Sequence, residues 1–234
     1  MLIYVLAAIT RVVIASCIII AGIATIGNGE LFDRGFLFLL SAIIIYALVH
    51  KKVDLFTIAF ILFAIAFFDE TLYLLPAHSS MKLLLYITCV YCLFVLRDEP
   101  LVAKVAAPIL LLSLIAEIYW FIIQYQAPQI FYYNTLIALN LIARRVIYIR
   151  LMYRYHWFKD ATTLVPLDRV IYNTSKWFVY SIALLLIEYM LRHTTSVDSL
   201  YIYYIYPYFQ HFALVYITLN LGEYTHKTIF KFSA

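Results

Sequence analysis

The sequence contains few glycines and few charged residues. Glycine occupies five of its 234 positions, and Asp, Glu, Lys and Arg together account for 13% of the chain. An ordinary soluble domain has about a quarter of its residues charged, so this composition excludes that class. No glycine lies between Gly35 and Gly222. The chain therefore has no GxxxG pair in its middle and little sign of the broken helices that form transport sites.

Cysteines are also few, and the sequence has no recognisable catalytic motif. Cys17, Cys89 and Cys92 all lie inside apolar runs, so they outline no disulfide framework. Cys89 and Cys92 have CxxC spacing, but no other metal ligand accompanies them. His211 has no second histidine at matching depth for a haem. There is no Gly-rich phosphate loop, GxSxG elbow or HExxH pair. We therefore expect no metal and no cofactor, and the sequence does not favour an enzyme.

Hydrophobic residues make up 66% of the chain and its mean hydropathy is +0.93. With ~20 residues needed for each membrane-crossing helix, this length predicts eight spans, with seven as the alternative. The predicted fold is all-α, a polytopic transmembrane helical bundle forming a single integral membrane domain over residues 1–234. Pro108 is expected to kink the fifth span. The expected spans are about 2–25, 35–49, 53–75, 81–96, 101–124, 130–149, 170–191 and 201–222.

The distribution of Lys and Arg predicts the orientation of these spans. Residues 144–176 carry seven of the seventeen cations and separate two apolar blocks, which is typical of a cytoplasmic connection. If residues 144–169 form that connection, alternation of sides leaves only Arg34, Lys82 and Arg192 outside and Arg11 within the membrane. The other thirteen of the 17 cations are then inside. This asymmetry predicts eight helices with both termini cytoplasmic, in the inner membrane of a bacterium.

Arg11 is the most costly ionisable residue in the expected spans. A charge in hydrocarbon costs at least ~2.5–3.5 kcal/mol, and Arg11 lies about ten residues into the first span. Ala8, Ala15 and Gly22 share its helix face, so that face can pack closely on another helix. The favoured interpretation is a structural ion pair or a contact with carbonyl groups, and the alternative is a substrate-anion or gating charge. The candidate partners are Asn140, His211, Glu117 and Glu188.

Two glutamates lie in the outer halves of their expected spans. Glu117 shares a face with Ser113, Trp120 and Gln124, and Glu188 shares a face with Asn173, Trp177 and Tyr180. If the two faces meet, they form a polar lining whose close carboxylates can hold a proton or a cation. The other interpretation is that each glutamate only bonds a neighbouring tyrosine or pairs with Arg11.

The basic stretch predicts a docking surface for an anionic leaflet or for an acidic cytoplasmic partner. Its cations alternate with aromatic rings, which suits phosphates and the acyl boundary respectively. The residues concerned are Arg144, Arg145, Arg150, Arg154 and Lys159. We expect membrane lipids as partners, together with a companion membrane or cytoplasmic protein or a second copy of the chain, and no nucleic acid.

These observations favour a multi-pass membrane protein that is not an enzyme. It would act as a subunit, sensor or scaffold through association with protein or lipid. The first alternative is a small ion or solute transporter or channel that uses Glu117, Glu188 and Arg11. The second is a membrane enzyme acting on lipid-linked substrates.

Overall fold

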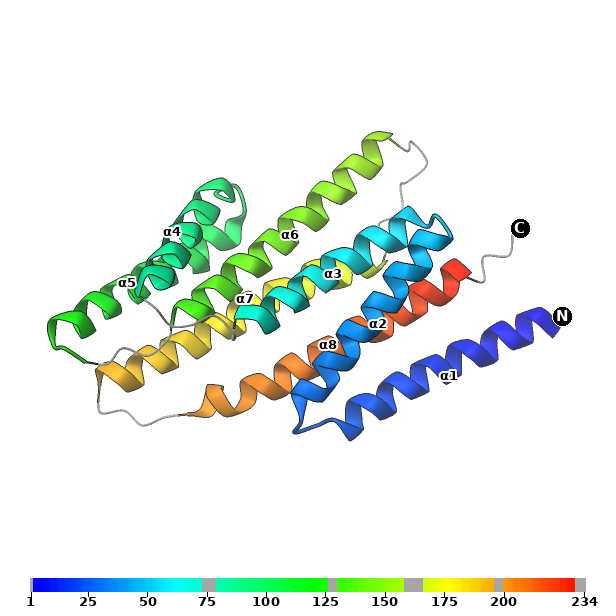
Figure 1. Cartoon of the computed structure of the whole chain (residues 1–234), viewed down its shortest axis with the longest axis horizontal. Coiled ribbons are helices and arrows are strands. Elements are labelled where there is room, and N and C mark those ends of the chain that lie inside the picture. Colours follow the sequence, from blue (N-terminus) through cyan, green and yellow to red (C-terminus); the bar gives the residue numbers. More distant parts are fainter. Residues whose placement is uncertain (1, 73–78, 126–129, 158–165, 196–199, 230–234) are drawn as a thin grey trace. The chain divides into compact units, whose positions relative to one another are not determined.

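The computed structural model describes residues 2–72, 79–125, 130–157, 166–195 and 200–229, and every regular element in them is helical. Eight α-helices follow one another along the described chain, and a π-helical turn, η1, precedes the fifth (Figure 1). The prediction of an all-α fold is therefore confirmed. The elements are α1 Leu2–Ala24, α2 Gly29–Val49, α3 Val53–Leu72, α4 Ser79–Val95, η1 Val102–Ala106, α5 Ala107–Ile122, α6 Phe131–Trp157, α7 Pro166–Thr194 and α8 Tyr201–Ile229.

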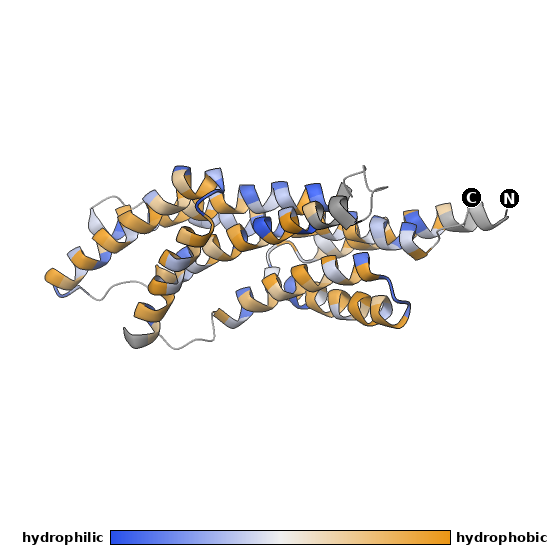
Figure 2. Cartoon of the chain, turned by 90° about the horizontal axis from the view of Figure 1, so that it is seen from above, coloured by the Kyte–Doolittle hydropathy of each residue, from blue (hydrophilic) through white to orange (hydrophobic). Residues whose placement is uncertain are grey.

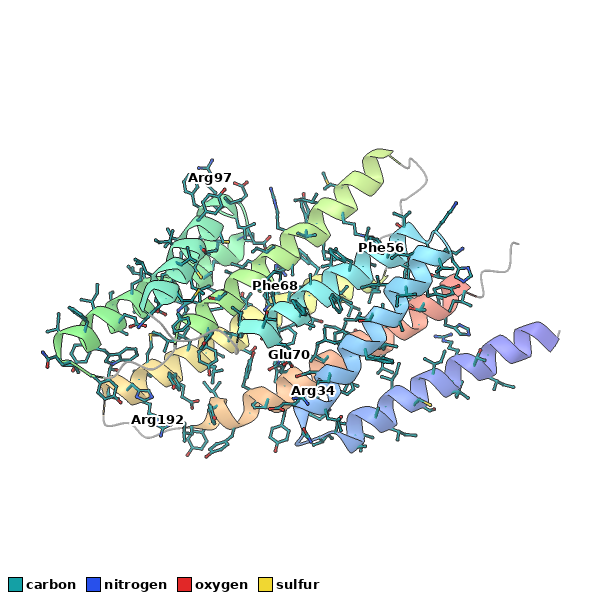
Figure 3. The ribbon with its side chains drawn as sticks, viewed as in Figure 1. Arg34, Phe56, Phe68, Glu70, Arg97 and Arg192 are labelled. Atoms are coloured by element: carbon teal, nitrogen blue, oxygen red, sulfur yellow. The ribbon has the colours of Figure 1, made fainter. Side chains whose placement is uncertain are left out.

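Four helical segments of the described chain are long and apolar enough to cross a membrane, namely α2, α3, η1 with α5, and α7. Two further apolar helices, Ala8–Ala24 and Met81–Val95, are shorter. Hydrophobic residues cover much of the length of the helices (Figure 2). Figure 3 shows Arg97 at the turn after α4 and Arg192 near the end of α7, so these charges lie where helices end. Helices of this length and composition suit a bilayer about 30 Å thick.

Several helices are longer than the spans expected from the sequence. α2 begins at Gly29 instead of 35, α7 runs from 166 to 194, and α8 continues to Ile229. Polar and aromatic residues extend these ends beyond the apolar runs. A π-helical turn, η1, lies just before Pro108, where the sequence predicts a kink, and in it the Ala107 N–H bonds the Val102 carbonyl. Proline lacks an N–H, so the preceding turn rearranges.

A three-residue turn joins α2 to α3. Lys51 has a positive φ of 53°, and the Lys52 N–H donates to the Ala47 carbonyl at 2.8 Å. Gln124 repeats this geometry after α5, with φ 53° and a bond of 2.9 Å from the Tyr125 N–H to the Trp120 carbonyl. Both patterns satisfy the last carbonyls of a helix through a left-handed residue, a role that glycine usually takes.

The chain divides into two compact units, and α3, α7 and α8 contribute to both. The first unit contains residues 1–67, 163–171 and 207–234, and the second contains 68–162 and 172–206. The second unit has a continuous apolar core in which Trp120, Leu141, Val179 and Leu186 are fully buried. In it, α4 packs mainly on α6.

In the first unit, α1 and α8 run antiparallel and approach closely. A Cβ atom added at Gly22 would lie 2.8 Å from a methyl carbon of Val215, and one added at Gly222 would lie 3.0 Å from Ile18. Each glycine therefore leaves room for a branched side chain of the other helix. The small face of α1 expected from the sequence thus includes a real contact at Gly22.

Candidate functional site

An ion pair between two of the expected spans lies in the second unit. Lys82 of α4 forms a salt bridge with Glu117 of α5, and their side chains are 28% and 13% exposed. The Tyr86 hydroxyl donates a hydrogen bond of 3.2 Å to the other oxygen of Glu117. Lys82 and Tyr86 lie one turn apart on α4, so both reach the same carboxylate. This pair neutralises two charges that would each be costly in lipid.

Two further polar contacts connect α4 and α5 to α6. Cys89 of α4 lies 3.9 Å from the Thr135 hydroxyl of α6, and the Ser113 hydroxyl of α5 lies 3.4 Å from the Asn134 carbonyl oxygen of α6. Ser113 and Asn134 are buried. Together these residues form what we call the α4–α6 polar cluster, which consists of Lys82, Tyr86, Cys89, Ser113, Glu117, Asn134 and Thr135. Each pair among α4, α5 and α6 is linked by at least one polar contact.

Trp120 and Gln124 lie outside this cluster. Trp120 is fully buried, and its indole N–H donates to the backbone carbonyl of His193 at 3.1 Å. The Tyr125 hydroxyl and the His193 ring are hydrogen-bonded at 2.9 Å, so the end of α5 is fastened to the end of α7. Gln124 is exposed and lies beyond the last residue of α5. The predicted common face therefore includes Ser113, Glu117 and Trp120 but ends before Gln124.

Glu188 holds the beginning of α8. Its two carboxylate oxygens accept hydrogen bonds from the backbone N–H groups of Ile202 at 3.0 Å and Tyr203 at 2.7 Å. The first N–H groups of a helix have no partner within the helix, and a negative charge there is favourable. Glu188 thus caps a helix that begins 13 residues further along the chain.

The polar lining expected from the fifth and seventh spans differs from the arrangement found. Trp177 is 59% exposed and Asn173 is also exposed, whereas Glu188 is buried. These residues therefore do not share one inner face of α7. Helix rotation explains this only in part: 15 residues separate Asn173 from Glu188 and turn the helix about 60° past whole turns, whereas the 11 residues from Trp177 to Glu188 make about three full turns. Glu117 and Glu188 each have the separate partners described above.

Arg144 occupies an internal site instead of the docking surface expected for it. Its side chain is 4% exposed, and its guanidinium donates to one Glu99 oxygen at 2.8 and 3.1 Å and to the Tyr172 carbonyl at 2.6 Å. The guanidinium also lies 3.7 Å from the centre of the Tyr172 ring. This contact joins α6, α7 and the turn after α4. Because these contacts engage the whole guanidinium, Arg144 is not presented to lipid.

The other cations of the expected docking surface are more open. Arg145 is half-buried and its guanidinium lies 5.8 Å from the centre of the Tyr148 ring, and Arg150 is also half-buried. Arg154 lies near the end of α6, where the side chain is not described, and Lys159 lies outside the described residues. Docking of lipid or protein at these positions remains a prediction.

Arg11 pairs with a residue that the sequence analysis did not consider. Its guanidinium lies 2.6 Å from Glu223 of α8, which also bonds Lys227 at 2.9 Å. Side chains lean toward the N-terminus of their own helix, and this direction brings Arg11 to the far end of the antiparallel α8. Glu223 follows the last residue of the expected eighth span. The hydrogen bond from Lys227 lowers the pKa of the Glu223 carboxyl, and the charge of Arg11 acts in the same direction.

His211 and Asn140, the other candidate partners of Arg11, bond elsewhere. His211 is buried, and its Nε2 lies 2.8 Å from the Gly22 carbonyl. A carbonyl can only accept, so Nε2 carries the proton and donates it. Phe32 meets the same imidazole edge to face, with 4.9 Å between ring centres. The Asn140 amide donates to the Leu136 carbonyl of its own helix at 3.0 Å. His211 therefore fastens α8 to α1.

In the part of the chain that the structure describes, no group of three His, Cys, Asp or Glu side chains could hold a metal ion. No known family model, curated protein or solved structure is significantly similar to the chain. The class of the protein therefore rests on its own sequence and fold. The apolar helices and the charge pairs between them define a multi-pass helical membrane protein.

Proposed function

We propose that this chain is a membrane subunit or scaffold that acts by associating with another chain or with a second copy of itself. The observation that carries the proposal is the internal pairing of its intramembrane charges. Lys82 with Glu117 and Arg144 with Glu99 are paired within one unit, and Glu188 caps α8. The contacts of Lys82 and Glu188 each join two helices, and that of Arg144 joins α6 to the turn after α4.

This pairing favours a structural role for the charges over a chemical one. A transport site has to exchange one partner for another, and a catalytic group has to be free to reach a substrate. Arg144 makes hydrogen bonds on both sides of its guanidinium and stacks on a ring. Glu117 has two donors from α4. Side chains held in this way stabilise a fixed helical framework, which suits a subunit that others assemble on.

Native mass spectrometry of membrane vesicles tests the association without detergent extraction. We expect the chain to be released together with a second chain, either its own copy or a companion, at one fixed stoichiometry. Vesicles that lack the chain provide the background masses. Release of the chain only as a single polypeptide, with or without lipid, would contradict the proposal.

We further propose eight spans with both termini in the cytoplasm. Two ion pairs and the cap of α8 support this topology, because each joins residues that the topology assigns to the same side. Glu99 and Arg144 fall at the inner ends of their spans, and Lys82 and Glu117 fall toward the outer ends. Glu188 lies toward the outer end of α7, where α8 begins. Antiparallel neighbours in a bundle with short loops produce this agreement.

Reporter fusions test the eight-span arrangement. A reporter that is active only in the cytoplasm should be active after Lys52, Arg97 and Ala234 and inactive after Ser80 and Ser196. Lys and Arg are retained on the cytoplasmic side, which gives the expected pattern. A cytoplasmic signal from the Ser196 fusion would exclude eight spans with both termini inside.

A further inference from the structure

A cavity of about 230 Å³ lies between α1 and α8 in the first unit. Its polar lining includes Arg11, Asn220, Glu223 and His226, and its apolar lining includes Ile14, Ala15 and Leu219. At ~30 Å³ for each water molecule, the volume holds several waters or one small headgroup. We call this cavity the α1–α8 pocket.

The charges at the α1–α8 pocket do not cancel when Lys227, which lies beside the pocket and bonds Glu223, is counted with Arg11 and Glu223 of its lining. Arg11 and Lys227 are both paired with the single carboxylate of Glu223, at 2.6 and 2.9 Å. Two cations and one ionised carboxylate leave one positive charge in excess. In contrast, Arg144 and Lys82 each face one carboxylate, so those pairs are balanced. The excess charge attracts an anion.

Arg11, which lines the pocket, and Lys227, which lies beside it, are also open to a ligand. The side chains of Arg11, Glu223 and Lys227 are 56%, 37% and 62% exposed, whereas Arg144 is 4% exposed. The guanidinium of Arg11 uses one nitrogen for Glu223, which leaves other donors that can bind an oxyanion. The Thr10 hydroxyl and the His226 ring are hydrogen-bonded at 3.0 Å, and this contact holds the two helices together beside the cavity.

The position of the pocket along the helices indicates which class of anion it would bind. Apolar residues of α1 and α8 line one part. Glu223 follows where the apolar run of α8 ends, and Arg11, which lies within the apolar run of α1, reaches Glu223 with its side chain. Cations just beyond an apolar run, on a helix in a membrane, lie at the level of the lipid phosphates. A phospholipid can place its phosphate against Arg11 and Lys227 while its chains stay in the bilayer.

We propose that the α1–α8 pocket binds the phosphate headgroup of an anionic phospholipid such as phosphatidylglycerol. This site is separate from the basic stretch of α6 and does not depend on the association proposed above. Glu223 limits the affinity, because its carboxylate repels the phosphate while it positions both cations. Removing a cation and removing the carboxylate should therefore change binding in opposite directions.

The test uses the full chain in nanodiscs of phosphatidylcholine with a minor share of phosphatidylglycerol. Native mass spectrometry reports how much phosphatidylglycerol remains bound. Lys227→Gln should reduce its retention about fivefold, the factor expected for one Lys or Arg near an anionic surface. Glu223→Gln should increase retention. Arg34→Gln is the matched control, because Arg34 is also an exposed cation paired with a glutamate four residues away, and it should retain lipid like the parent.

Three results would overturn the proposal. The first is that Lys227→Gln and Glu223→Gln retain as much phosphatidylglycerol as the parent. The second is an equal loss in Arg34→Gln, which would mean that any surface cation attracts the lipid. The third is displacement of phosphatidylglycerol by soluble glycerol phosphate at the same concentration, which would assign the pocket to a soluble phosphate. Thermal unfolding of each variant verifies that it is folded.

Discussion

Arg144→Ala should destabilise the protein by ~3–5 kcal/mol, the usual loss when one partner of a buried ion pair is removed. The substitution leaves the Glu99 carboxylate, which is 10% exposed, without the guanidinium that it pairs with. It also removes the bond to the Tyr172 carbonyl and the contact with the Tyr172 ring. Three elements of the second unit therefore lose their common contact. Unfolding of the detergent-purified protein, followed by temperature or denaturant, measures the effect.

The neighbouring arginine supplies the control. Arg145 is half-buried and its ring contact is a distant 5.8 Å, so Arg145→Ala should cost less than ~1 kcal/mol. Replacing both members of the pair, Arg144→Met with Glu99→Met, should recover much of the loss because no unpaired charge remains. Equal losses from Arg144→Ala and Arg145→Ala would contradict the buried pair.

Glu117→Ala should also destabilise the protein by ~3–5 kcal/mol. It leaves the Lys82 ammonium, whose side chain is 28% exposed, without its carboxylate and removes the acceptor of the Tyr86 hydroxyl. Glu117→Gln should cost less than Glu117→Ala, since its carbonyl oxygen can still accept one of the two hydrogen bonds, whereas the amide nitrogen in place of the other oxygen cannot accept. The order of unfolding temperatures, parent above Gln above Ala, is the expected result.

The exposed ion pair of α2 provides a comparison for the effect of burial on stability. Glu30 and Arg34 are 82% and 73% exposed and lie four residues apart on α2. Glu30→Gln should therefore change stability by less than ~0.5 kcal/mol. Exchanging the buried pair, Lys82→Glu with Glu117→Lys, should restore part of the stability that either single change removes. Failure of the exchange to exceed both single variants would argue against direct pairing.

Much of the helical arrangement could be predicted from the sequence because apolar run length reports directly on spans. Every expected span has a helix in the structure, and the turn at Lys51 closes α2 where the sequence ends its apolar run. Helix ends were harder to predict. α8 continues to Ile229 because Glu223, Thr225 and Lys227 are compatible with a helix, although they are too polar for a span.

Partners of the charged residues could not be predicted from apolar patterns. Arg144 has the spacing of a buried face with Leu141 and Ile147, which was an available signal, but its partner Glu99 lies 45 residues away. Glu223 was missed for Arg11 because it lies beyond the apolar run. Such pairs depend on which helices are neighbours and how their ends align, and periodicity within one segment contains no information on either.

The α4–α6 polar cluster is where a structural role and a transport role can be separated most directly. Proteoliposomes that contain a pH-sensitive dye report proton flux driven by a potassium diffusion potential. Because Glu117 is held by Lys82 and Tyr86, the parent and Glu117→Gln should both match protein-free liposomes in proton flux. A proton flux in the parent that Glu117→Gln abolishes, with the variant still folded and inserted, would contradict the account.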